Sequence, residues 1–126
     1  IGIKPFFELY GTSFPTPDGT CIRDYIHVSD LAMAHMLSLK ELTRQGTSVS
    51  LNLDTGKGIS VMEIIKEVKR NLKTDFNVVV KEERHGDAAE LVADPRKAYE
   101  YLNWNPQYSD LDNIINTAYA WKKANL

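Results

Sequence analysis

Two arginines are the residues in this sequence best suited to hold a charged ligand. Arg23 lies within residues 19–28, and Arg84 lies within residues 83–87, just after a β-branched run. Arginine stays ionised and presents a planar fork of N–H donors, which suits the adjacent anionic groups of a diphosphate. Most arginines only keep a protein surface soluble, so neither residue alone establishes a site.

Strands are expected to position both arginines. Apolar and polar residues alternate, with a turn-rich loop between the two runs, and this predicts a strand at 6–10 and a second strand at 21–28. On the second strand, Arg23 and Tyr25 share one face. β-branched residues predict a further strand at 77–81, directly before the second arginine.

Four helices are expected to complete a mixed α/β (α+β) unit. The first is apolar nearly all round over 31–39 and ends near Gly46. A short strand is expected at 50–53, between the first and second helices. Ser29 or Asp30 is expected to cap the first helix, and Ser60 with Glu63 to cap the second in a capping box. Asp94 before Pro95 is expected to start the third helix, and Ser109 to cap the fourth.

The composition argues against several classes of protein. Of the 126 residues, 43% are hydrophobic and 25% are charged, and the formal net charge is −2. The chain can therefore bury a core, and no broad basic face for a nucleic acid is expected. Its apolar runs are far shorter than the ~20 residues of a membrane helix. A single cysteine, Cys21, and no Cys/His cluster with zinc-ligand spacing favour a cytoplasmic protein without a metal.

The start of the chain favours a piece of a longer protein. Residue Ile1 is not a methionine, and a strand-like run follows it almost at once. A processed or incompletely described N-terminus is the alternative. No repeat or long linker divides residues 1–126, so one domain is expected.

Residues 14–32 closely resemble the signature run of UDP-glucose 4-epimerases. The resemblance covers nearly the whole chain after Glu8. It continues through residues 52–53, 56–61, 84–87, 93–98 and 102–106.

This resemblance implies a two-part enzyme of the extended short-chain dehydrogenase/reductase group. In that group an N-terminal Rossmann domain binds NAD, and a smaller C-terminal domain binds the UDP-sugar. Residues 1–126 are then expected to be the UDP-sugar-binding C-terminal domain, without the NAD-binding domain and inactive alone. The intact enzyme would interconvert UDP-glucose and UDP-galactose, and relatives are usually homodimers.

The resemblance also implies site residues. Arg23 and Arg84 are expected to bind the diphosphate. Asp87 is expected to contact the ribose or to orient an arginine. Tyr25 lines the same pocket, although a hydrogen-bonded strand residue is its alternative role. The residues expected to border the uracil are Glu8, Leu9 and Tyr10; Tyr10 would stack on the base, or be a plain strand-edge aromatic.

Two positions depart from the usual pattern of the group. Asp54 stands where relatives usually have glycine, which puts the local turn in doubt. Leu91 takes a position that faces the sugar and is often bulkier, so room for an N-acetyl group is expected and UDP-GlcNAc becomes a candidate substrate.

The catalytic residues of such an enzyme are not expected in this chain. The reaction moves a hydride from C4 of the sugar to NAD and back, with a Tyr-x-x-x-Lys pair as the base. A Gly-x-Gly-x-x-Gly turn is absent from the sequence, since Gly56-x-Gly58 lacks the third glycine. Tyr119 and Lys123 have the spacing of the pair but fall on the last predicted helix, so we interpret them as a coincidence.

Two other functions remain open from the sequence. One is a related nucleotide-sugar dehydratase or decarboxylase, against which the loop at 17–20 argues. The other is a stand-alone UDP-sugar-binding module. Neither His27 nor His85 is assigned a functional role.

Overall fold

The computed structural model describes residues 4–125, and Ile1 lies outside the described residues. The mixed α/β composition predicted from the sequence is confirmed. The elements are β1 (Phe6–Tyr10), β2 (Ile22–Asp24), α1 (Val28–Gln45), β3 (Gly58–Ser60), α2 (Val61–Leu72), β4 (Asn77–Lys81), β5 (Glu90–Leu91), α3 (Arg96–Leu102) and α4 (Leu111–Ala124).

The strands form two small sheets. In the first, β1 pairs in parallel with β4, and Tyr10 lies opposite Lys81. In the second, β2 lies between β3, which is antiparallel to it, and β5, which is parallel to it, so that Arg23 lies opposite Leu91. Parallel pairing needs a long crossover connection, and it therefore brings distant parts of the sequence together.

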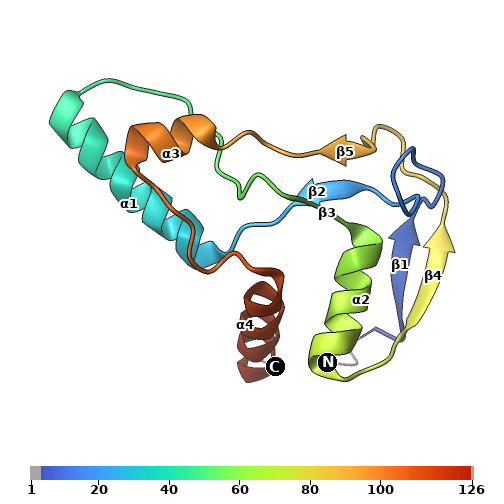
Figure 1. The fold of residues 1–126 in the computed structure, drawn as a ribbon. Coiled ribbons are helices and arrows are strands. Elements are labelled where there is room, and N and C mark those ends of the chain that lie inside the picture. Colours follow the sequence, from blue (N-terminus) through green and yellow to red (C-terminus); the bar gives the residue numbers. More distant parts are fainter. Residues whose placement is uncertain (1–3, 126) are drawn as a thin grey trace.

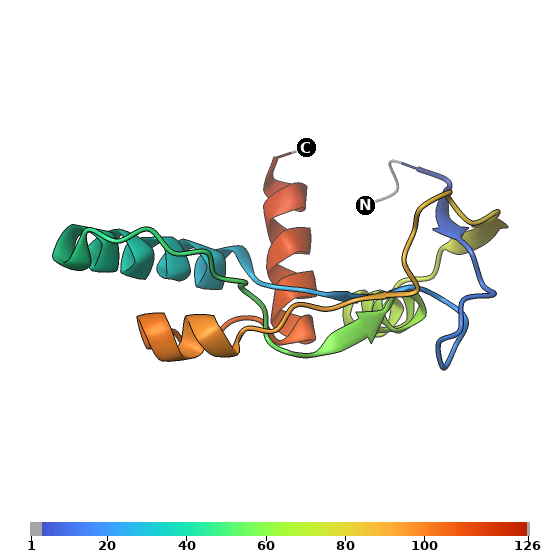
Figure 2. The same ribbon diagram turned by 90° about the horizontal axis from the view of Figure 1, so that it is seen from above.

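The elements are spread along the molecule rather than wrapped around one centre. In Figure 1, α1 and α3 lie side by side at one end, β1 and β4 lie at the other, and β2, β3 and β5 run between them. Helices α2 and α4 extend from the middle. Figure 2 shows the same separation from above, with α1 and α3 again together and far from β1 and β4.

Buried apolar residues hold these parts together in two places. Where α1 meets α3, Ala34 and Ala98 are both fully buried and allow the helices to approach closely, and Trp104 packs against them. Where α2 meets α4, the buried Ile115 of α4 lies with Ile64 of α2 in the space between the two helices. These buried residues are thus divided between the α1–α3 contact and the α2–α4 contact.

Several sequence predictions about helix ends are confirmed. Ser60 caps α2 and accepts a hydrogen bond from the Glu63 N–H at 3.0 Å, and the Glu63 carboxylate accepts one from the Ser60 N–H at 2.7 Å. This is the predicted capping box. Helix α1 ends at Gly46, which has the left-handed backbone conformation expected of a C-terminal cap.

The predicted N-terminal cap of α1 is wrong. The helix begins at Val28, and its cap is His27, whose Nδ1 accepts a hydrogen bond from the Ser29 N–H at 3.0 Å. Neither Ser29 nor Asp30 caps the helix. The carboxylate of Asp30 is instead occupied by donors from the segment that precedes α4.

The predicted cap of α4 is also wrong by one residue. Asp110 caps the helix by accepting a hydrogen bond from the Asn113 N–H at 2.9 Å. Ser109 has a different role, because its hydroxyl donates to Asp30 at 2.6 Å and accepts from the backbone N–H of His27 at 2.9 Å. Because the Ser109 hydroxyl is bonded to these distant residues, it does not cap α4.

Two predicted strands also need correction. The strand expected at 21–28 is limited to β2, because its partners β3 and β5 are only three and two residues long and the ladder ends with them. The strand expected at 50–53 does not form within the described residues. No strand among the described residues pairs with this segment. Its Ser50 carbonyl accepts a hydrogen bond from a side chain instead, the Lys97 ammonium, at 3.2 Å.

Candidate functional site

The first part of the candidate site forms where β1 and β4 end. The Tyr10 hydroxyl donates to the Glu8 carboxylate at 3.2 Å, and the Lys81 ammonium lies 3.7 Å from the other oxygen of that carboxylate. The first contact lies within β1, between residues two apart that share one face. The second follows from the parallel register, which sets Tyr10 opposite Lys81 and so brings Lys81 near Glu8. Lys81 was not among the residues predicted from the sequence, because only the register reveals it.

Arg84 extends this cluster from the chain just after β4. The carbon of its guanidinium lies 4.8 Å from the centre of the Tyr10 ring, a cation–π contact, and its Nε donates to the Asp87 carboxylate at 3.0 Å. The Arg84 side chain is 64% exposed. Because the bond to Asp87 uses Nε, the two terminal nitrogens can receive an anion without breaking that bond.

The predicted residues Glu8, Tyr10, Arg84 and Asp87 therefore form one continuous set of contacts. Leu9 lies between two of them and is buried, with only 2% of its surface exposed, so its side chain anchors β1 while its neighbours face outward. We call the four contacting residues the Tyr10–Arg84 cluster.

Arg23 lies on the second sheet. It is half buried on β2, opposite Leu91 of β5, and its guanidinium donates to the Ile22 carbonyl at 2.7 Å. Leu91 is 64% exposed, so its side chain is free to meet a ligand. The parallel pairing of β2 with β5 thus brings Arg23 beside a residue that the sequence analysis assigned to the sugar.

The two arginines belong to adjoining groups rather than to one contact. Among residues 4–125, the hydrogen bonds and ion pairs of Arg23 include none to Arg84 or Asp87. The segment that leads from Asp87 to β5 runs beside β2, where the Ile22 N–H donates to the Ala89 carbonyl at 2.8 Å. In Figure 1 this segment lies near the ends of β1 and β4, so it connects the two groups.

Tyr25 lies just beyond the end of β2. It lines an apolar groove of about 390 Å³ between α2 and α4, with Ile64 and Ile114 among its neighbours. Burial raises the pKa of the Tyr25 phenol, and the nearby charge of Arg23 partly offsets this effect. The phenol is therefore neutral, and the residue links the arginine to the helices.

The loop between β1 and β2 fixes the position of β2. Asp18 accepts hydrogen bonds from the Thr20 N–H at 2.9 Å, from the Thr20 hydroxyl at 2.7 Å and from the Ser60 hydroxyl at 2.5 Å. Burial opposes ionisation of Asp18, but these bonds outweigh it and lower the pKa of its carboxyl. The strand that carries Arg23 is thereby tied to the start of α2.

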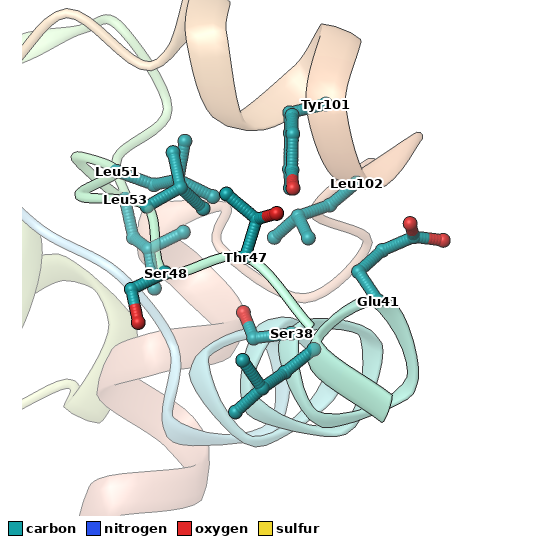
Figure 3. Close-up of a pocket in the computed structure, with 10 residues that line it drawn as sticks. Ser38, Glu41, Thr47, Ser48, Leu51, Leu53, Tyr101 and Leu102 are labelled. Carbon is teal, nitrogen blue, oxygen red and sulfur yellow. The ribbon is translucent and has the colours of Figure 1, made fainter. Parts of the chain in front are cut away.

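A separate cavity of about 280 Å³ lies between α1 and α3 and holds none of the predicted site residues. Figure 3 shows Leu51, Leu53 and Leu102 around it, with Glu41 at its rim. The Glu41 carboxylate is already bonded to Arg44 and Gln45. The floor of this cavity is apolar, and its carboxylate already has hydrogen-bond partners within α1. We therefore interpret it as a packing surface rather than a polar binding site.

Other sequence features contribute nothing to this site. Tyr119 lines the same groove between α2 and α4 as Tyr25, and Lys123 is exposed near the end of α4. In the part of the chain that the structure describes, no three acidic, histidine or cysteine side chains gather as metal ligands would. No helix there has the length and apolar character to cross a membrane.

Comparison with known proteins identifies the chain as a C-terminal portion of an extended short-chain dehydrogenase/reductase. A family model described as GDP-mannose 4,6 dehydratase matches residues 5–117, and the chain belongs to this family. A curated relative, the UDP-glucose 4-epimerase of Rhizobium meliloti (strain 1021), is 45% identical over 121 residues. That match covers 96% of this chain but only 37% of the relative.

Solved structures agree with this assignment. A crystal structure of a UDP-glucose 4-epimerase superimposes with a TM-score of 0.92 at 43% identity, covering 98% of this chain and 37% of that one. The UDP-glucose 4-epimerase from Brucella ovis in complex with NAD gives a TM-score of 0.85 at 46% identity, covering 90% of this chain and 35% of that one. The greater part of each relative therefore lies outside the match.

Proposed function

We propose that this chain is the UDP-sugar-binding part of an NAD-dependent UDP-glucose 4-epimerase. The observation that carries the proposal is the Tyr10–Arg84 cluster, in which an aromatic ring, a cation with free N–H groups and two carboxylates meet at the ends of parallel strands. These are the groups that recognise a base, a phosphate and a sugar hydroxyl. Similarity to two-part epimerases supports the same assignment.

In this proposal the residues of this chain bind and orient the substrate. Arg84 and Arg23 grip the diphosphate from two sides, Tyr10 and the backbone of Leu9 border the uracil, and Tyr25 lies behind Arg23 as a neutral phenol. Asp87 holds Arg84 in place through its bond to Nε. NAD supplies the transient oxidation of the sugar at C4 when it is bound by the remainder of the enzyme.

The cofactor is proposed to lie outside this chain. A dinucleotide site needs a glycine-rich turn between a strand and a helix, and the 126 residues contain no such sequence. One neighbour is described as a complex with NAD, and its match to this chain covers 35% of its length. The catalytic tyrosine and lysine are assigned to the same remainder.

The alternatives from the sequence analysis are less well supported. A dehydratase shares the family, as the description of the family model shows, but the relatives reported above are described as UDP-glucose 4-epimerases. A stand-alone binding module would have to bind its ligand at the exposed Tyr10–Arg84 cluster without any residues from a second domain. We also propose that the intact enzyme is a cytoplasmic homodimer that acts in galactose metabolism. Beside Leu91 we propose that there is room for the N-acetyl group of a UDP-GlcNAc substrate.

Calorimetric titration with UDP and UDP-glucose tests the proposed binding residues. We expect weak binding by the chain alone, and a further loss of about tenfold or more in Arg23→Ala and in Arg84→Ala, because each removes charge-assisted hydrogen bonds to phosphate. Arg96→Ala is the matched control, since Arg96 is also exposed and paired with a nearby carboxylate, that of Asp94. Equal affinity in Arg84→Ala and Arg96→Ala would contradict the proposal.

A second prediction concerns a surface that the proposal leaves without a partner. Helix α1 exposes Met36 and Leu39 by 66% and 60%, on a face that also carries Val28. An apolar row of this kind promotes association in water. We expect the chain alone to form dimers or larger species by sedimentation velocity, and Met36→Lys/Leu39→Lys to shift it towards monomer.

Gln45→Lys is the control for this experiment, because it adds a charge to the same helix away from the apolar row. The control should leave association unchanged. A monomer at high concentration for the unaltered chain would show that the row needs no partner.

A further inference from the structure

A recess lies beside the Tyr10–Arg84 cluster, along the first sheet. Its volume is about 440 Å³, within the size range of small-ligand pockets, and its lining residues are Lys4, Pro5, Phe6, Phe7, Glu8 and Tyr10. Phe6, Glu8 and Tyr10 alternate along β1 and therefore share one face of the strand. The Glu8 carboxylate thus lies between two aromatic residues that can cover the faces of a flat ring.

The charged pair beside this recess retains the capacity to bind a ligand. The Lys81 ammonium lies 3.7 Å from Oε1 of Glu8, which is longer than the about 2.7–2.9 Å of a charge-assisted hydrogen bond. Among residues 4–125, the ammonium has this one ion-pair partner and no hydrogen bond. The Lys81 and Glu8 side chains are 44% and 37% exposed, so a bound ring can reach both.

A carboxylate beside an ammonium matches the edge of some nucleobases and opposes that of others. The carboxylate only accepts hydrogen bonds, and the ammonium only donates them. Uracil presents an N–H donor next to a carbonyl acceptor, whereas cytosine presents a ring-nitrogen acceptor next to an amino donor. With cytosine, each member of the pair would face a group of its own kind.

We propose that Glu8 and Lys81 select the base of the bound nucleotide. The Glu8 carboxylate accepts from the uracil N3–H, and the Lys81 ammonium donates to the carbonyl oxygen next to it. This inference rests on the proposed function, because it takes the UDP-sugar to bind at the Tyr10–Arg84 cluster. It assigns a role to Lys81, and it gives the side chain of Glu8 a role in specificity.

The groups that bind the base and the phosphate are connected through Tyr10. Its hydroxyl donates to the Glu8 carboxylate at 3.2 Å, and its ring contacts the guanidinium of Arg84 at 4.8 Å. A base that covers the recess also removes water from the pair, and an unpaired or repulsive contact costs more where water is excluded. Selection therefore depends on repulsion of cytosine as well as on attraction of uracil.

Calorimetric titration with UDP and with CDP tests this selection, because the two ligands carry the same diphosphate and differ at the edge of the base. We expect the unaltered chain to bind UDP about tenfold more tightly than CDP. Glu8→Gln supplies an amide that can donate to cytosine, and Lys81→Met removes the donor to the uracil carbonyl. Each substitution should reduce the preference to about twofold or less.

Lys69→Met is the matched control for Lys81→Met. Lys69 is also paired with a carboxylate, that of Asp75, and it does not line the recess, so its replacement should leave the preference for UDP unchanged. The Lys81–Glu8 pair is exposed and contributes little to folding stability, so the Glu8→Gln and Lys81→Met chains should fold.

Arg84→Ala separates this inference from the proposed function. It should weaken UDP and CDP alike and keep their ratio, because Arg84 is proposed to bind the diphosphate that both ligands share. If Arg84→Ala weakens binding while Glu8→Gln and Lys81→Met keep the ratio of the unaltered chain, base selection by the pair is wrong and the proposed function stands. Equal affinity of the unaltered chain for UDP and CDP would also overturn the selection. Absence of any UDP binding would overturn both proposals.

Discussion

Replacing Asp30 by alanine is expected to lower the free energy of unfolding by about 3–5 kcal/mol, a large share of the total stability of a small domain. The buried carboxylate of Asp30 accepts three hydrogen bonds, from the Gln107 N–H at 2.8 Å, the Tyr108 N–H at 2.8 Å and the Ser109 hydroxyl at 2.6 Å. Alanine would leave all three donors unpaired. Urea unfolding of the full chain, followed by circular dichroism, measures the loss.

The location of Asp30 explains why the effect should be so large. Its side chain joins the start of α1 to the segment before α4, and its carbonyl accepts from the Trp104 indole at 3.1 Å. Asp110→Ala provides the control, because Asp110 is exposed and makes one capping bond, to the Asn113 N–H. A cap of this kind contributes about 1 kcal/mol. Similar losses in the two variants would contradict the importance given to the buried carboxylate.

The same carboxylate also gives the chain a defined acid sensitivity. Burial opposes ionisation of Asp30, but the hydrogen bonds from Ser109, Gln107 and Tyr108 outweigh it and lower the pKa of Asp30. A lowered folded pKa stabilises the chain above the unfolded value, and this stability is lost as the pH falls through the folded value.

The local parts of this fold are readable in the sequence, whereas the contacts between segments are not. The Ser60–Glu63 capping box and the Gly46 helix end depend on neighbouring residues and were predicted correctly. Ser109 fits a cap pattern equally well, yet Asp30 takes its hydroxyl from a distance of 79 residues along the chain. Local pattern cannot show that a remote partner binds the same side chain more favourably.

The candidate site shows the same division. The types of Arg84 and Tyr10 indicate a ligand site, but their cation–π contact depends on the parallel register of β1 and β4, which no local signal specifies. Lys81 enters the site through that register alone. The strand expected at 50–53 has the right residues for a ladder and lacks a neighbour within the described chain, because strand formation needs a partner as well as a pattern.

Replacing Gly19 by alanine should lower the free energy of unfolding by about 3–4 kcal/mol, near the upper end for a single substitution. Gly19 has a φ of +78°, and a methyl group there would lie 2.1 Å from the Thr12 carbonyl oxygen. That oxygen belongs to the backbone, so no side chain can rotate to make room. The loop is further closed by the Phe14 N–H, which donates to the Gly19 carbonyl at 3.0 Å.

Gly46→Ala separates the two effects of the methyl group. Gly46 also has a positive φ, of +66°, but a methyl group there would meet nothing within 4 Å. Its expected loss is therefore only the conformational one, about 1–2 kcal/mol. The difference between the two variants measures the displacement of the loop that carries Asp18, and with it the tie between β2 and α2. Equal unfolding free energies for the two variants would mean that this loop yields freely and that the position of Arg23 is set by the strand ladder alone.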